Sequence, residues 1–175
     1  MTDKICAIFF LLLLFGFPQA SAAADSGDIF FSNHTTEKEI ISGKTPTGVV
    51  LWTHEDGNGG IAISLDQPPM KSFKKATNYC KSLRQGNRYA GEWHLPTLLE
   101  FFPIDKMQGH IIDGRRLEHI NDRLKNIRGA QRLKNEYYLT STNNGSSAVA
   151  VNPFTGDIKE VPLKKRLYFR CVTGF

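Results

Sequence analysis

Two cysteines, Cys80 and Cys171, constrain the fold of this 175-residue chain more than any other sequence feature. A third cysteine, Cys6, lies inside an N-terminal segment that has the features of an export signal. In an oxidising compartment, a disulfide between the two remaining cysteines is the expected state. Such a bond would close a long loop and stabilise one domain by up to about 4–5 kcal/mol. Two separate buried thiols are the alternative that the sequence leaves open.

The first 23 residues are typical of a secretory signal peptide. Lys4 supplies positive charge, residues 8–17 form an apolar run, and Pro18 ends that run. Small residues at 20–24 suit a signal peptidase, and the run is shorter than the about 20 apolar residues of a membrane anchor. We therefore expect cleavage of residues 1–23 and export to the periplasm, the cell surface or the medium, with no membrane span in the mature chain.

The remaining sequence predicts one α+β domain. About 150 residues are enough for a single domain with a real core. Residues 24–42 are polar and are interpreted as an N-terminal lead-in that contains one short strand at 29–31. Residues 43–175 are interpreted as the domain itself, because strands, then helices, then strands follow one another along it.

Residue patterns predict three helices between two groups of strands. A hairpin is expected over 47–65, and a first helix over 72–83. Thr97 and Glu100 form a capping-box pattern, which predicts that a short second helix starts at Thr97. A third helix ends near Gly129, and its apolar face is predicted to carry Leu117, Ile120, Leu124 and Ile127. Further strands are expected at 137–140, 148–151, 158–161 and 167–172.

Six motifs occur along the chain in an order that resembles one bacterial domain family. They are a helix that carries Cys80, the Gly-Glu-Trp-His-Leu-Pro-Thr sequence at 91–97 with Glu100, and the segments at 120–124, 138–142, 148–156 and 170–172. Together they resemble the WRLPT-type family, which is named after the C-terminal domain of the Legionella collagen-like adhesin. The chain departs from the family pattern at His94, where Arg is usual, and at Leu139, where Trp is usual.

The resemblance implies a C-type-lectin-like fold. Such a fold has a mixed antiparallel sheet with two to three helices, and a disulfide joins its first helix to its last strand. In this chain the resemblance places that bond between Cys80 and Cys171. It would thereby remove both thiols from any catalytic role.

The motif around Trp93 is interpreted as structural rather than as a binding site. Trp93, Leu95 and Pro96 are residue types that usually build a packed corner of a core. Thr97 and Glu100 have the helix-capping role already given. We therefore expect these five residues to position the chain rather than to contact a ligand.

The sequence predicts neither a metal site nor catalytic residues. Residues 54–56 are adjacent potential ligands whose side chains would diverge, while His110, Asp113 and His119 would need further partners. The Glu-Pro-Asn and Trp-Asn-Asp motifs of calcium-dependent lectins are absent from the sequence. Ser141 has no evident histidine and acid to activate it. We expect a non-enzymatic domain without a cofactor.

An excess of positive charge, +5 over the whole sequence, points towards an anionic ligand. Basic residues gather in two clusters, one along the third helix and its exit and one in the last loop. The candidate ligand-binding residues are Arg115, Arg116, Arg123, Lys125, Arg128 and Arg132 in the first cluster, and Lys164, Lys165 and Arg166 in the second. Such clusters suit sulfated or carboxylated polysaccharides. The alternative is a solvated helix face with a surplus of charge.

These features predict an exported, adhesin-like binding module whose partner is an anionic polysaccharide or a surface protein. Nucleic acid would fit the charge, but an exported domain seldom meets it, so we do not expect it as a partner. The alternative function is a structural or assembly subunit of a surface appendage or secretion apparatus. In that case the lead-in over 25–44 would pair with a neighbour's strand in a homo-oligomer or an appendage.

Overall fold

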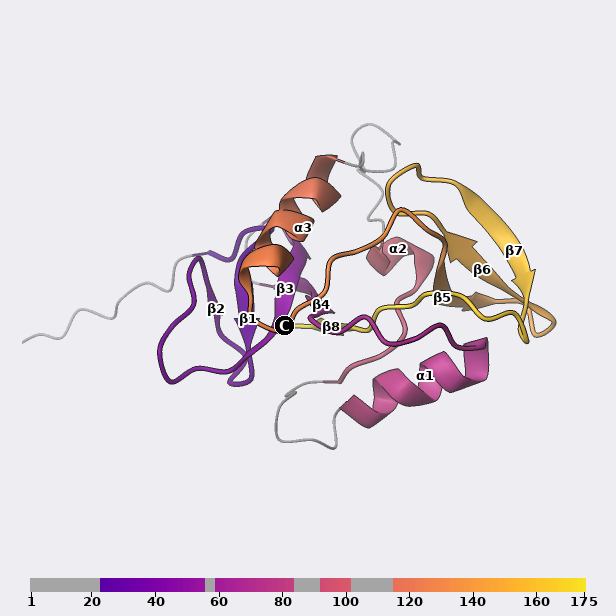
Figure 1. Ribbon diagram of the computed structural model, residues 1–175, viewed down its shortest axis with the longest axis horizontal. Helices are drawn as coiled ribbons and strands as arrows, with labels where there is room; N and C mark the ends of the chain where they lie inside the picture. The colour runs from indigo at the N-terminus through magenta and orange to yellow at the C-terminus, as the bar shows by residue number, and fades with distance from the viewer. Residues whose placement is uncertain (1–22, 56–58, 84–91, 102–114) are drawn as a thin grey trace, which may run out of the picture.

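The structure is a computed structural model that describes residues 23–55, 59–83, 92–101 and 115–175. Two antiparallel sheets and three helices make up its described part, which confirms the predicted α+β class (Figure 1). None of the helices in these ranges combines the length and the apolar character that crossing a membrane requires.

The larger sheet has five strands in the order β2-β1-β3-β4-β8, and every neighbouring pair is antiparallel. The strands are β1 (Ile29–Phe31), β2 (Thr36–Glu37), β3 (Pro46–Thr53), β4 (Gly60–Ser64) and β8 (Val172–Gly174). The strand expected in the N-terminal segment is therefore an inner strand, paired on both sides. The edge strand beside it is β2, which has only two residues. So short an edge strand is a poor template for pairing with a strand of a neighbouring chain.

The smaller sheet has three antiparallel strands in the order β5-β6-β7 (Figure 1). Its strands are β5 (Tyr138–Asn143), β6 (Ser147–Val151) and β7 (Ile158–Pro162). The prediction of a final strand over 167–172 was wrong. Leu167 pairs with Lys71 and Tyr168 pairs with Tyr138 in isolated bridges, and only Val172 begins β8. Successive residues of this segment bond to different parts of the fold, so no continuous ladder forms.

The larger sheet buries both of its faces. Ile29 and Phe31 of β1 belong to the core that includes α3 (Arg115–Asn126), while Phe30 between them packs with residues of α1 (Phe73–Ser82). This alternation follows from the two-residue period of a strand. The predicted apolar face of α3 is buried, and each such side chain stabilises the fold by roughly 1.5–3 kcal/mol. Gly129, at a φ of 82°, lets the chain turn away from the end of this helix.

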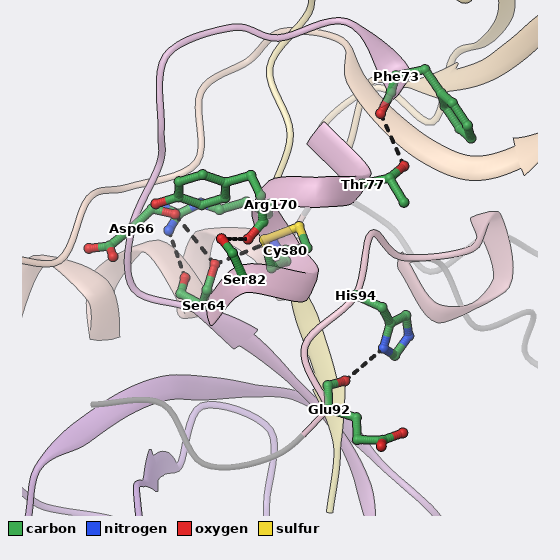
Figure 2. The surroundings of a disulfide bond; sticks show 11 residues. Ser64, Asp66, Phe73, Thr77, Cys80, Ser82, Glu92, His94 and Arg170 are labelled. Carbon is green, nitrogen blue, oxygen red and sulfur yellow. Dashed lines mark hydrogen bonds between the residues drawn. A yellow bond between two sulfur atoms is a disulfide. The ribbon is translucent and has the colours of Figure 1, made fainter. Parts of the chain in front are cut away.

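The predicted disulfide is present, with an S–S distance of 2.04 Å between Cys80 and Cys171 (Figure 2). Cys80 lies on the buried face of α1, together with Ala76. Cys171 lies one residue before β8 rather than inside a strand. The bond therefore joins the first helix to the segment that leads into the last strand.

The Trp93 motif forms a buried corner followed by the capped helix α2 (Leu98–Phe101). Trp93, Leu95 and Pro96 are buried. The amide of Thr97 donates to Glu100 Oε2 at 2.8 Å, and the amide of Glu100 donates to Thr97 Oγ1 at 3.1 Å. This reciprocal pair is the predicted capping box, and it confirms that Thr97 precedes the helix.

His94 forms an ion pair with the capping carboxylate. Its Nε2 lies 2.9 Å from Oε1 of Glu100. Its Nδ1 lies 3.0 Å from the carbonyl oxygen of Glu92 (Figure 2). The bond to Glu100 raises the pKa of His94 above its ordinary value of 6.5. The same bond lowers the pKa of Glu100 to about 2, against an ordinary 4.5. An arginine at this position would carry a permanent charge, whereas the charge of His94 depends on pH.

Replacing both cysteines by alanine (Cys80→Ala/Cys171→Ala) is expected to lower the free energy of unfolding by up to about 4–5 kcal/mol. The disulfide restricts the unfolded chain over a separation of 91 residues. Urea denaturation of the two proteins measures the difference. As a control, reductant should lower the midpoint of the wild type and leave the double variant unchanged. Equal midpoints throughout would contradict a stabilising bond.

The His94→Gln variant is expected to lose stability mainly between about pH 4.5 and 6.5. The raised pKa of His94 means that its contribution is complete below pH 6.5 and is lost as pH rises through the raised value. The lowered pKa of Glu100 means that its contribution is present above pH 4.5 and is lost as pH falls towards 2. The pair is partly exposed, so the loss should be at most about 1 kcal/mol.

Thermal melts of wild type and variant across this range provide the measurement. His34→Asn is the matched control, because His34 has no ion pair with the described residues and its φ of 63° tolerates asparagine. The control should shift melting temperatures by the same amount at every pH. A pH-independent loss in His94→Gln would show that the ion pair contributes nothing.

Candidate ligand-binding site

A pocket of about 450 Å³ lies where three segments of the chain meet. Its lining residues come from Gln67 to Met70 after β4, from Gln131 to Lys134 after α3, and from Arg166 to Tyr168 before β8. Its volume falls within the range of about 300–1,000 Å³ that is typical of small-molecule sites. We refer to it as the basic pocket, because three of its lining residues are cations.

Backbone and side-chain bonds hold the first and third segments together. Lys71 and Leu167 exchange backbone hydrogen bonds of 3.1 and 3.2 Å. Beside them, Arg166 donates from Nε at 3.2 Å and from Nη2 at 3.1 Å to the carbonyl oxygen of Met70. The guanidinium is thereby fixed at the rim of the pocket even though it is exposed.

Hydrogen bonds join the second segment to the end of β4 and to the residues that follow it. The amide of Gln67 donates to Gln131 Oε1 at 2.7 Å, and the amide of Gln131 donates to the carbonyl of Leu65 at 3.0 Å. Arg170 is fully buried, and its Nη1 donates to the carbonyl of Ser64 at 2.6 Å (Figure 2). Its Nη2 donates to the carbonyl of Gln131. A buried cation needs such acceptors, so all three segments are held at one place.

Tyr168 lines the pocket, and its neighbour Tyr138 bonds to two of the lining segments. The hydroxyl of Tyr138 donates to Gln67 Oε1 at 2.9 Å and accepts from the amide of Lys134 at 2.8 Å. Burial raises the pKa of Tyr138 above its ordinary value of 10, which keeps the donating proton in place. The ring of Tyr168 lies 5.9 Å from that of Tyr138, and Lys134 Nζ lies 4.8 Å from the centre of the Tyr168 ring.

The pocket has a positive charge that its described lining does not neutralise. Arg132, Lys134 and Arg166 are exposed, and no described lining residue is acidic. Arg132 makes no hydrogen bond or ion pair with another residue in the described ranges. The pocket therefore favours anions, and Arg132 is available to one.

The structure brings together only part of the candidate set predicted from the sequence. Arg132 and Arg166, one from each cluster, line the basic pocket. The other candidates with described side chains lie outside the lining of the pocket. Four of them are exposed to solvent, namely Lys125, Arg128, Lys164 and Lys165. The fifth, Arg123, has its Nη1 3.9 Å from Oε1 of Glu39. Arg115 and Arg116 begin α3, but their side chains fall outside the described part of the structure.

Sequence reasoning missed the wall that faces these cations. No sequence pattern singled out Gln67, Pro68, Pro69 or Met70, none of which carries a charge. Tyr168 was assigned to a strand. The available signal was a proline pair next to an exposed methionine, but long-range pairing of Lys71 with the segment before β8 is not encoded in any local pattern.

Potential metal ligands do not cluster in the part of the chain that is described. Asp56, His110 and Asp113 lie outside the described residues. The ring of His54 packs edge-on against Trp52, with 5.3 Å between the centroids. His54 therefore has a packing role against Trp52.

The Tyr138→Phe variant is expected to lower the free energy of unfolding by about 1–3 kcal/mol, because it leaves the Lys134 amide without its acceptor and Gln67 Oε1 without its donor. Urea denaturation measures the change. Tyr137→Phe is the matched control, since its hydroxyl has no hydrogen bond to the described residues; it should change stability by less than about 0.5 kcal/mol. Equal losses would show that the hydroxyl of Tyr138 does not support the pocket.

No protein-family model matches the chain, and no curated protein matches it. The resemblance to the WRLPT-type family therefore rests on the motifs and stays a prediction. The basic pocket is defined by contacts among this chain's own residues, so it does not depend on that resemblance.

Proposed function

We propose that this chain is an exported, non-enzymatic binding module that recognises an anionic glycan, or an anionic group on a surface ligand, through the basic pocket. The observation that carries the proposal is the meeting of Arg132, Lys134 and Arg166 at one concave site. Three cations around a cavity attract an anion more strongly than the same charges spread over a surface, because the low-dielectric walls focus their field.

Binding fits this site better than catalysis does. The described lining consists of amides, a tyrosine, prolines, a methionine and cations. Nucleophilic and general-base catalysis usually need a thiol, a hydroxyl with a base beside it, an imidazole or a carboxylate. The described lining contains no such pair, whereas it offers several donors for a ligand's oxygen atoms.

Two features support the exported, C-type-lectin-like part of the proposal. The disulfide suits an oxidising compartment. It also joins the first helix to the segment before the last strand, which is close to the connection that the family resemblance implies. The buried Trp93 corner with its capped helix is consistent with the same family.

The wild type is expected to elute from a heparin column above physiological salt, and the triple variant Arg132→Gln/Lys134→Gln/Arg166→Gln at clearly lower salt. The variant removes the cations that surround the pocket, and the binding of an anionic polysaccharide weakens as ionic strength rises. The salt concentration at elution is the measurement, with circular dichroism to check that the variant is folded.

The matched control removes three exposed charges elsewhere, in the variant Lys74→Gln/Lys75→Gln/Lys81→Gln on α1. It lowers the net charge by the same amount but leaves the pocket unchanged. Its elution should shift much less than that of the pocket variant. If both variants shift equally, or neither does, heparin responds to overall charge and the proposed site is wrong.

A further inference from the structure

We infer that the basic pocket binds one saccharide ring that carries an oxyanion, which is either a carboxylate or a sulfate ester. This inference rests on the proposed function and names the part of the ligand that the pocket holds. The pocket is much larger than a bare anion requires, at about 450 Å³. A ligand that matches the charge of the pocket carries an anionic group. A ligand that fills the rest of the volume also carries an uncharged part attached to that group.

The two arginines supply complementary contacts for the oxyanion. Arg166 uses Nε and one bond from Nη2 for the carbonyl of Met70, which fixes the plane of the guanidinium. Its Nη1 has no hydrogen-bond partner among the described residues, so the Nη1–Nη2 edge stays available. A planar fork held in this way can donate two parallel bonds to a carboxylate or a sulfate. Arg132, without a described partner, can approach the same group from the α3 side.

The aromatic wall excludes ligands that need a free ring face. The ring of Tyr168 contacts that of Tyr138, with 5.9 Å between the centroids, and the ammonium of Lys134 lies 4.8 Å from the centre of the Tyr168 ring. A nucleobase would have to displace Lys134 before it could stack there. Lys134 also donates from Nζ to the Tyr168 hydroxyl at 3.3 Å, so the cation is held in that position.

The apolar part of the lining suits the body of a sugar ring. Pro68, Pro69 and Met70 present an apolar surface, and Met70 is 42% exposed. The C–H face of a pyranose can lie on such a surface. Gln131 accepts from the amide of Gln67 through Oε1, which leaves its NH₂ group to donate to a ring hydroxyl. An extended peptide has less support, because Lys71 and Leu167 already bond to each other through their backbones.

A titration of the mature chain, monitored by ¹⁵N NMR, tests the inference with four probes: methyl β-D-glucuronide, glucose 6-sulfate, methyl β-D-glucoside and inorganic sulfate. At least one charged sugar should bind saturably and shift the amide signals of Gln67, Met70, Gln131 and Tyr168. The neutral glucoside and inorganic sulfate should each bind at least 10-fold more weakly. Which of the two charged sugars binds tells whether the oxyanion is a carboxylate or a sulfate ester.

The Arg132→Gln/Arg166→Gln variant should weaken binding of the charged sugar at least 10-fold, since both bonds to its oxyanion are lost. Lys164→Gln/Lys165→Gln is the matched control, because these exposed cations lie near Arg166 in sequence but outside the pocket lining; it should change affinity less than 2-fold. Arg166 also holds Met70, so Arg132→Gln alone serves as a second variant that leaves that contact intact.

Three outcomes would overturn the inference. They are shifts that map outside the pocket, inorganic sulfate that binds as tightly as the sugars, and no binding of either charged sugar. If the same chain still elutes from heparin above physiological salt, with the dependence on pocket cations given above, the proposed function stands and only the single-ring inference fails. If that retention is absent as well, both fail.

Discussion

The fold depends on how the charge of Arg170 is accommodated in the interior. Removing a guanidinium from water is costly unless carbonyl or carboxylate oxygens replace the lost hydration. Here the carbonyl of Ser64 at the end of β4 and that of Gln131 beyond α3 are two of those acceptors. Both backbones must therefore approach the segment before β8. The disulfide at the next residue, Cys171, adds α1 to the same junction. The short stretch at 170–171 thus brings three distant parts of the chain together.

This junction also explains why a pocket forms where it does. Loops that leave β4 and α3 would otherwise be free to separate, and short exposed loops are usually the least ordered parts of a domain. The bonds of Arg170, Gln67 and Tyr138 hold them at fixed spacing. Cations at the rim are then positioned before any ligand arrives, so a ligand would not have to order them, which favours affinity.

Local signals predicted the local structure well. The Thr97–Glu100 pattern specifies a capping box, the apolar spacing from Leu117 specifies the buried face of α3, and the cysteine pair specified the disulfide. Contacts between distant segments had no such signal. The segment after Arg166 is rich in apolar and aromatic residues, as a buried strand is, yet its residues bond separately to Lys71, Tyr138 and Ser64, so the predicted strand does not form. The pocket likewise arises from contacts between distant segments. Charge in the sequence identified Arg132 and Arg166 but not the uncharged residues of the lining.

The disulfide and the Arg170 bonds have a kinetic consequence. The disulfide joins Cys80 to a cysteine 91 residues further along the chain, and the hydrogen bond from Arg170 to Ser64 spans 106 residues. Contacts of such long range form slowly, because the chain loses the conformational entropy of a large loop before the contacts can stabilise it. The β3–β4 hairpin can form early, but the larger sheet is complete only when the last segment of the chain adds β8. Until that segment has been made, Cys80 remains an unpaired thiol and the larger sheet lacks its edge strand β8.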